Sequence, residues 1–331
     1  NGATVELNAE VTDIEETADA FRVATERGDI EAQIVVNAAG LYADVISEMV
    51  GVDDFEITPR RGEYYLYDKE TDVDVQRTVF PVPSEVSKGI VVTPTDEGNV
   101  MIGPNAEEVD DVTEKATTRE GLDEVLAGAQ ETVPDLSKDD VIREFAGLRP
   151  AIKETGDFRI RIERRDPGFV NVAGIQSPGL ASAPAVAELV VDLVGDLAGG
   201  LTEDSTFDPQ YSPPPKTRHM SHAERAALIE EDPAYGQIIC RCEMITEGEI
   251  RDAINDPVGA RTINAIKRRV RPGAGRCQGG FCQPRVVEIL AEEHGVDETD
   301  IKLEGDGSEV LIGDTKELLL AEDSEEVRAD D

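Results

Sequence analysis

The chain has 331 residues, of which 39% are hydrophobic, a length and composition that favour two compact units joined by a linker. Its 71 acidic residues outnumber the 32 basic ones and give a formal net charge of −39, which repels anionic lipid and excludes nucleic acid as a partner. The longest apolar segment, residues 181–198, is interrupted by Glu188, Asp192 and Asp196, so we expect no transmembrane segment.

The excess of acidic residues also indicates the kind of cell that makes the protein. Self-repulsion weakens a compact state unless salt screens it, and the Debye length falls to roughly 3 Å in 1 M salt. We therefore expect a cytoplasmic protein of a halophile; the alternative is an acidic protein from a low-salt cell, with a disordered acidic tail at residues 317–331. The chain begins with Asn1 rather than Met and has no signal peptide, so we expect further sequence upstream.

The first predicted elements form a strand, a turn and a helix. Residues 4–36 alternate apolar and polar positions and end in an apolar run at residues 34–36. Asn37-Ala38-Ala39-Gly40 follows as a tight turn, and apolar residues at helical spacing predict a helix over residues 41–50. This order is typical of a buried strand that delivers the chain into a helix.

Short strands then predict an antiparallel sheet with two helices. Strands are expected at residues 63–67, 89–93, 100–103, 141–148, 158–163 and 169–174, and helices at residues 118–133 and 183–197. Residues 201–236 are expected to form a linker, because residues 201–217 are polar and rich in proline. Ser221 and Glu224 form a capping-box pattern that opens a short helix inside this linker.

All four cysteines lie close together after the linker, at Cys240, Cys242, Cys277 and Cys282. In a cytoplasmic protein such clustering indicates a metal site rather than disulfides. Zinc sites usually contain Cys-x2-Cys pairs, whereas this chain has Cys-x-Cys and Cys-x4-Cys. The spacing therefore favours an iron–sulfur cluster over zinc.

The charge around the cysteines supports the same interpretation. Residues 260–285 contain seven basic residues and no acidic one: Arg261, Lys267, Arg268, Arg269, Arg271, Arg276 and Arg285. A [2Fe–2S] cluster held by four thiolates is a net anion that such groups stabilise. The alternative is a basic docking patch around a zinc site. Gly273, Gly275, Gly279 and Gly280 allow close backbone approach, and Pro284 suits the first turn of a following helix.

Three segments around the cysteines resemble the bacterioferritin-associated-ferredoxin-like (BFD-like) [2Fe–2S] domain. They are residues 239–243 (Ile-Cys-Arg-Cys-Glu), residues 246–250 (Thr-Glu-Gly-Glu-Ile) and residues 275–282 (Gly-Arg-Cys-Gln-Gly-Gly-Phe-Cys). The resemblance implies a small helical domain over residues 237–300, with all four cysteines as cluster ligands. Short strands and the acidic tail are expected over residues 301–331.

The first two hundred residues resemble FAD-dependent oxidoreductases of the D-amino-acid oxidase-like family. The resemblance rests on four segments: the turn at residues 37–40, Arg-Gly-Glu-Tyr-Tyr at residues 61–65, Gly-Leu-Arg-Pro at residues 147–150 and Gly-Ile-Gln-Ser-Pro-Gly-Leu at residues 174–180. It implies an incomplete Rossmann-like α/β domain over residues 1–200, with an antiparallel α+β substrate subdomain at about residues 52–165. The glycine-rich unit that binds the FAD pyrophosphate is expected upstream.

The same resemblance implies FAD and substrate contacts. Expected FAD contacts are Val11, Asn37, Ala38, Ala39, Gly40, Gly174, Ile175, Ser177, Pro178, Gly179 and Leu180. Arg149 and then Arg61 are candidates for binding an anionic substrate group, because guanidinium matches carboxylate or phosphate in a two-pronged way. All three histidines lie outside this part, so a general base would be Tyr64 or Tyr65, come from upstream, or be unnecessary for an amine substrate.

The combined features predict an FAD-dependent dehydrogenase like those that oxidise glycerol 3-phosphate or a small 2-hydroxy acid. Electrons would leave through the [2Fe–2S] cluster to a partner subunit or a quinone-linked partner, which could also supply peripheral membrane attachment. One alternative is an amino-acid or imino-acid dehydrogenase subunit with the same architecture. Another is a non-catalytic iron–sulfur docking protein.

Overall fold

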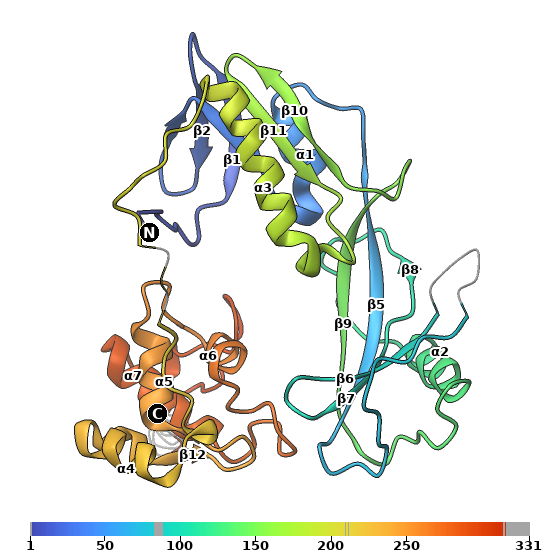
Figure 1. Ribbon diagram of the computed structural model, residues 1–331, viewed down its shortest axis with the longest axis vertical. Helices are drawn as coiled ribbons and strands as arrows, with labels where there is room; N and C mark the ends of the chain where they lie inside the picture. Colours follow the sequence, from blue (N-terminus) through green and yellow to red (C-terminus); the bar gives the residue numbers. More distant parts are fainter. Residues whose placement is uncertain (1, 83–88, 209, 211, 314, 316–331) are drawn as a thin grey trace, which may run out of the picture. The chain divides into compact units, whose positions relative to one another are not determined.

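The computed structural model describes residues 2–82, 89–208, 210, 212–313 and 315. The chain divides into two compact units, Asn1–Asp208 and Pro209–Asp331 (Figure 1). Each unit has its own buried cluster of apolar side chains, so each is described by itself.

Two small sheets lie at one end of the first unit. Strands β1 (Val11–Glu16), β2 (Phe21–Thr25) and β3 (Ile30–Ala32) form an antiparallel sheet, and β10 (Arg159–Arg165), β11 (Gly168–Ala173) and β4 (Ile34–Asn37) form the other. Strand β11 runs parallel to β4, more than a hundred residues earlier in the chain. A short 3₁₀ turn (Gly40–Tyr42) and α1 (Ala43–Met49) follow β4. This is the strand, turn and helix that the sequence predicts.

A five-stranded antiparallel sheet forms the other end of the first unit. Its strands are β5 (Ile57–Tyr67), β6 (Val91–Pro94), β7 (Val100–Gly103), β8 (Glu107–Glu108) and β9 (Val141–Ile152). Helix α2 (Arg119–Gln130) begins at Thr118, whose side chain accepts a hydrogen bond from the backbone of Gly121. Tyr65 and Tyr67 of β5 pack against Leu122 of α2 in one buried cluster. The helix therefore covers one face of this sheet (Figure 1).

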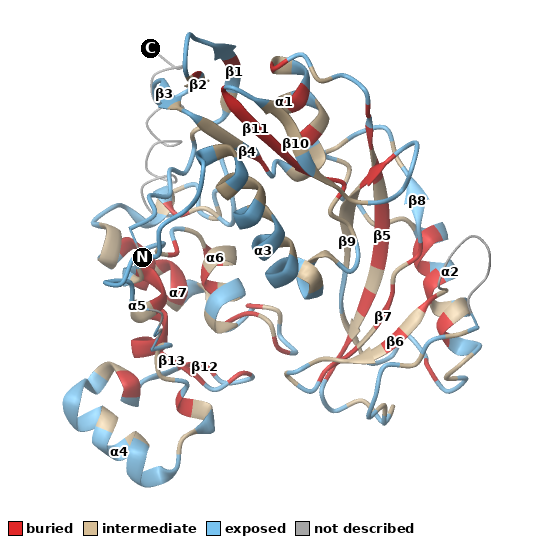
Figure 2. Ribbon diagram, turned by 45° about the horizontal axis from the view of Figure 1, so that its top comes forward, coloured by how far each residue is buried: buried red, intermediate tan, exposed pale blue. Residues whose placement is uncertain are grey.

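The longest helix of the first unit is α3 (Gly179–Ala198). None of its residues is buried, and Leu180 in its first turn is 95% exposed (Figure 2). Among the described residues, no helix is both long enough and apolar enough to cross a membrane.

The second unit is mainly helical. Its elements are 3₁₀ turns at Thr217–His219, Pro233–Gly236 and Glu298–Asp300, strands β12 (Ile238–Cys240) and β13 (Ile245–Thr246), and helices α4 (His222–Glu231), α5 (Glu247–Asn255), α6 (Ile263–Val270) and α7 (Gln283–His294). The core is rich in isoleucine and includes Ile250, Ile266 and Ile289, all fully buried.

Residues that the sequence assigns to a linker pack into this second unit. Thr217 is buried, and its backbone N–H and hydroxyl donate to the Glu249 carboxylate at 3.2 and 2.8 Å. The predicted capping box of Ser221 and Glu224 is present at the start of α4. The segment before residue 237 therefore contains more than a spacer, because buried contacts fix it to the helices that follow.

Other sequence predictions have clear outcomes. The helices expected at residues 118–133, at residues 183–197 and after Cys282 are confirmed as α2, α3 and α7. The described residues form a mixed α/β structure with several sheets and seven α-helices. Of the short strands expected after residue 300, the described residues form a single bridge between Lys302 and Glu309. The acidic tail at residues 317–331 lies outside the described residues.

Candidate functional site

The pairing of β5 with β9 decides which candidate substrate residues share a face. Arg149 lies opposite Arg60, and Tyr64 lies opposite Phe145. Side chains alternate between the faces of a sheet, so Arg149, Arg60 and Tyr64 lie on one face and Arg61 lies on the other. The structure therefore brings Arg149 and Tyr64 together and separates Arg61 from them.

The Arg149 side chain is held in place by a hydrogen bond, but its guanidinium keeps other N–H donors available. One terminal nitrogen, Nη2, donates to the backbone oxygen of Asn105 at 2.9 Å, while its buried Nε has no hydrogen-bond partner. No carboxylate of the described chain pairs with it. Gly62 makes room for this side chain, because a Cβ there would lie 2.9 Å from Nη2. A half-buried guanidinium with unused donors suits an anionic ligand.

Tyr64 supplies a second polar group on the same face. Its ring stacks on Phe145, with centroids 4.9 Å apart and an angle of 7° between the ring planes. Burial raises the pKa of the Tyr64 hydroxyl, while the nearby Arg149 charge opposes that rise. The hydroxyl therefore stays protonated at neutral pH and suits donation of a hydrogen bond better than proton abstraction.

Arg61 has a different environment. It is buried on the α2 face, and its guanidinium pairs with Glu107 at 2.6 Å, with Glu114 at 3.5 Å and with the fully buried Glu63 at 3.5 Å. Hydrogen bonding to Glu107 raises the pKa of Arg61 despite burial. With three carboxylate neighbours, its charge is already balanced.

The turn after β4 combines a buried side chain with an exposed backbone. Asn37 is buried, and its amide donates to the Ala43 backbone and the Asn171 side chain at 2.7 and 2.8 Å. Its oxygen accepts from the backbone of Ala39 at 3.2 Å. Ala38 and Ala39 are exposed. Asn37 thus shapes the turn, and the exposed backbone is the part that a ligand could contact. Val11 packs on a separate apolar cluster.

The segment from Gly174 to Leu180 leads into α3. Gly174 has a positive φ of 70° and no space for a Cβ, which would lie 2.8 Å from Ile152. Ser177 and Pro178 are exposed, Ile175 and Gly179 are half-buried, and no side chain caps the helix. The Gly179 N–H donates to the Gln176 backbone oxygen at 2.6 Å, and no side chain caps the N–H groups that follow it, so the start of α3 is an environment that stabilises negative charge. This suits the electron-rich edge of a flavin ring.

The four cysteines meet in the second unit as two pairs. Cys240 and Cys282 are buried and hydrogen-bonded to each other, and Cys242 and Cys277 are exposed with their sulfurs 3.9 Å apart. Gly275 permits this approach, since a Cβ there would lie 2.4 Å from the Cβ of Cys242. Two thiol pairs from segments far apart in sequence match the donor set of a two-iron cluster.

Backbone donors surround the sulfurs. The hydrogen bond within the Cys240–Cys282 pair lowers the pKa of Cys240, to which the backbone N–H groups of Gly273 and Glu243 contribute, and raises the pKa of Cys282. Backbone N–H groups of Phe281 and Gly279 similarly lower the pKa of Cys277. Thiolate is the ligating form of cysteine, so this pocket fits an anionic iron–sulfur cluster. Among the described side chains, no three of His, Cys, Asp or Glu are arranged to hold one metal ion.

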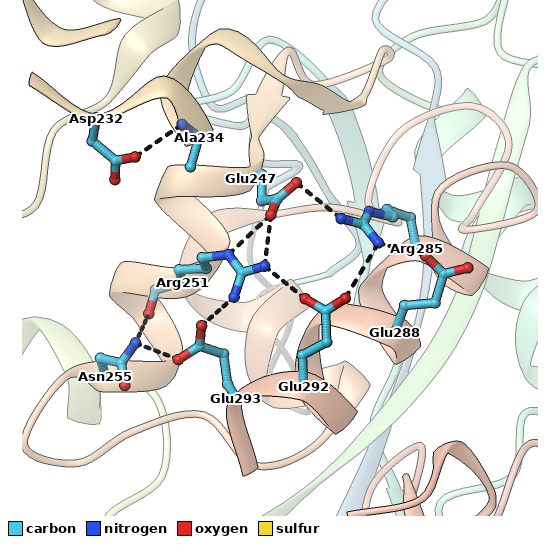
Figure 3. A network of polar contacts seen from close by, with 9 residues as sticks. All are labelled: Asp232, Ala234, Glu247, Arg251, Asn255, Arg285, Glu288, Glu292 and Glu293. Carbon is cyan, nitrogen blue, oxygen red and sulfur yellow. Dashed lines mark hydrogen bonds and ion pairs between the residues drawn. The ribbon is translucent and has the colours of Figure 1, made fainter. Parts of the chain in front are cut away.

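An ionic network fixes the two helices that flank the cysteines (Figure 3). Glu247 in the first turn of α5 pairs with Arg251 at 2.7 Å and with Arg285 of α7 at 3.1 Å. Arg251 also contacts Glu292 and Glu293 of α7. Because Cys282 immediately precedes α7, the network sets the position of this ligand relative to α5.

Three contacts of the site were not expected from the sequence, and for one of them the sequence carried a signal. Asn105, Phe145 and Phe281 belong to none of the expected sets, although Asn105 holds Arg149, Phe145 stacks on Tyr64 and the Phe281 ring lies 4.9 Å from the Arg241 guanidinium. Phe281 sits inside the cysteine motif, which was a usable signal. The contacts of Asn105 and Phe145 depend on the path of a loop and on the register between two strands.

Comparisons with known proteins match the two units separately. The family model described as FAD dependent oxidoreductase matches residues 1–193, and that described as BFD-like [2Fe-2S] binding domain matches residues 238–292. The glycerol 3-phosphate dehydrogenase of Caloramator mitchellensis is 48% identical over 316 residues, which cover 96% of this chain and 66% of the relative. The chain spans about half to two thirds of the length of the curated relatives it matches.

Solved structures agree in fold. The L-alpha-glycerophosphate oxidase of Mycoplasma pneumoniae, with FAD bound, is 33% identical with a TM-score of 0.57, and the match covers 62% of this chain and 54% of the oxidase. The glycerol-3-phosphate dehydrogenase of Bacillus halodurans, complexed with FAD, gives a TM-score of 0.62 at 20% identity and covers 88% of this chain and 65% of that one. At that identity the second match shows the fold alone.

Proposed function

Because the chain belongs to the FAD-dependent oxidoreductase family and carries a BFD-like [2Fe–2S] binding domain, we propose that it is part of a dehydrogenase that oxidises glycerol 3-phosphate. A small 2-hydroxy acid is the second substrate class that fits. The names of the relatives and the glycerol 3-phosphate enzymes among similar structures support this choice.

The observation that carries the proposal is the state of Arg149. Its guanidinium is half-buried, faces Arg60 across the strand pair and has no carboxylate partner in the described chain. In a protein with 71 acidic residues, a half-buried cation without a carboxylate partner needs an explanation. A bound phosphate or carboxylate supplies the missing charge.

The chain's own groups have distinct roles in this proposal. Arg149 binds the anionic group of the substrate, and the protonated Tyr64 hydroxyl donates to a substrate oxygen. Arg61 holds the opposite face of the sheet together through Glu107 and Glu63 and acts as a positioning residue. When bound, FAD supplies the two-electron acceptor, and the uncapped start of α3 with the exposed backbone of Ala38 and Ala39 would contact it.

The cysteine unit gives the enzyme a one-electron outlet. We infer that Cys240, Cys242, Cys277 and Cys282 hold the [2Fe–2S] cluster. A cluster has no use in an enzyme that passes electrons directly from flavin to oxygen, so the acceptor is a partner subunit or a quinone-linked protein. A cytoplasmic location fits this role.

Turnover with a substrate panel tests the proposal. Anaerobically purified protein carrying FAD is assayed with glycerol 3-phosphate, 2-hydroxy acids and amino acids, using an artificial electron acceptor. Arg149→Leu should raise KM and lower kcat/KM about 30-fold to 100-fold, because a charge-assisted hydrogen bond contributes about 2–3 kcal/mol and each 1.4 kcal/mol is tenfold.

Arg143→Leu is the matched control. Arg143 lies on the same face of β9 but is exposed and stacks over Phe145, so its loss should change kcat/KM less than about threefold. Turnover restricted to amino acids would show that the alternative, an amino-acid dehydrogenase, is correct. A protein that binds no FAD and turns over no substrate would instead be the iron–sulfur docking protein.

A further inference from the structure

The cysteine pocket is strongly asymmetric. Cys240 and Cys282 are almost fully buried against the isoleucine core, whereas Cys242 and Cys277 reach the surface of the unit. Electron transfer between proteins is fastest where the redox group is least covered by protein, so the Cys242 and Cys277 edge is the side at which a partner would gain access.

The surface around this edge has a composition that differs from the rest of the chain. We define the cysteine rim as the six exposed residues Arg241, Cys242, Met244, Arg276, Cys277 and Phe281. The rim contains two arginines, two large apolar side chains and no acidic residue. The one acidic residue within the two short segments that carry the rim, residues 241–244 and 276–281, is Glu243, which is buried and pairs with Arg271 at 3.0 Å.

Phe281 and Arg241 contact each other within the rim. The Phe281 ring is 62% exposed, and the Arg241 guanidinium lies 4.9 Å from its centroid. This cation–π contact orders both side chains without neutralising the charge of Arg241. Exposed aromatic and arginine side chains of this kind are enriched among residues that dominate protein–protein binding.

We propose that the cysteine rim is a docking surface for an acidic electron-transfer protein. This rests on the proposed function, in which single electrons leave through the cluster. Charge complementarity selects the partner: a chain with a net charge of −39 repels acidic proteins over its acidic surface, whereas the exposed Arg241 beside Phe281 attracts one to the rim. A symmetric dimer that joined two rims would bring like charges together, which disfavours this arrangement.

Binding of a probe protein tests the proposal without relying on turnover. The probe is a plant-type [2Fe–2S] ferredoxin, which is acidic, and mitochondrial cytochrome c serves as a basic comparison. Dissociation constants are measured for the holoprotein and its variants at low and high salt. Phe281→Ala and Arg241→Glu should each weaken ferredoxin binding about tenfold to thirtyfold, as expected for central residues of an interface.

Two control variants lie in the same unit but away from the rim. Arg261→Glu changes an exposed arginine before the start of α6, and Val296→Ala shortens an exposed side chain beyond the far end of α7, whose twelve residues span about 18 Å. Both should change ferredoxin affinity less than about twofold. The effect of Arg241→Glu should shrink in high salt, while that of Phe281→Ala should persist.

Several outcomes would overturn the docking surface. They are unchanged affinity in Phe281→Ala, an equal loss in Arg261→Glu and Arg241→Glu, or tighter binding of cytochrome c that Phe281→Ala weakens. Analysis of iron and inorganic sulfide separates this result from failure of the proposed function. Wild-type protein without iron and sulfide would remove the redox function, whereas protein that contains both, with affinities unchanged in the variants, removes the docking surface alone.

Discussion

At the scale of single residues, Glu63 shows how a buried charge determines its neighbours. Its carboxylate is fully buried, accepts from the backbone N–H and hydroxyl of Thr118 at 2.8 and 2.9 Å, and lies 3.5 Å from Arg61. The position at the start of α2 is favourable for an anion. Gly121 must be glycine here, because a Cβ would lie 2.3 Å from a Glu63 oxygen.

Gly121→Ala should therefore destabilise the first unit. Alanine is normally the better helix residue by about 1 kcal/mol, but forcing a methyl group against the buried carboxylate costs more, so we expect a net loss of about 2 kcal/mol. Gly195→Ala is the control, since its Cβ would meet nothing closer than 3.7 Å in α3 and should be neutral or stabilising. Urea unfolding followed by circular dichroism measures both, and equal effects would contradict the argument.

At the scale of elements, one buried carboxylate lies at the centre of the ionic network between α5 and α7. Glu247 is buried and bridges Arg251 and Arg285 (Figure 3). Burial alone would raise the pKa of Glu247, but hydrogen bonds from these two arginines outweigh it and hold the pKa below its ordinary value. A depressed pKa in the folded state means that ionised Glu247 stabilises the fold above the unfolded-state pKa.

Glu247→Gln should lower the free energy of unfolding of the second unit by about 2 kcal/mol at pH 7, because it removes the buried carboxylate that Arg251 and Arg285 share and leaves them with more exposed partners. The difference from wild type should shrink as pH falls below about 4.5 and through the lower folded-state pKa, since wild-type Glu247 then becomes neutral as well. Urea unfolding across pH 7 to 3 measures this.

Glu288→Gln provides the matched comparison for the network. Glu288 pairs with Arg285 at 2.6 Å, but its side chain is 43% exposed, so its removal should cost less than about 1 kcal/mol. A stability difference for Glu247→Gln that stays constant down to pH 3 would show that shape, rather than charge, accounts for its role.

Sequence patterns predicted the helices and strands better than they predicted the contacts between them. The capping box at Ser221 and the proline-started helix after Cys282 are local signals, and both predictions were correct. The separation of Arg61 from Arg149 depends on the register between β5 and β9, about eighty residues apart, which no local pattern encodes. The inward-pointing side chain of Asn37 likewise depends on Asn171 of a distant strand.

At the scale of the whole molecule, the excess of acidic over basic residues affects the stability of the fold. A formal net charge of −39, which already counts all 32 basic residues, adds repulsion to the folded state that ion pairs such as those of Arg61 and Arg251 do not remove. Screening by salt weakens long-range repulsion more than it weakens buried ion pairs. Added salt should therefore stabilise both units.

The thermal midpoint should accordingly rise by at least about 5 °C between 0.2 and 2 M KCl, as followed by circular dichroism. The way in which the thermal midpoint depends on KCl concentration identifies the cause of the rise. Screening of repulsion levels off near 1 M, where the Debye length is about 3 Å, whereas exclusion of solute from the protein surface keeps increasing with concentration. A midpoint that is flat or falls with KCl would mean that surface ion pairs outweigh the repulsion, and that the acidic surface is no adaptation to salt.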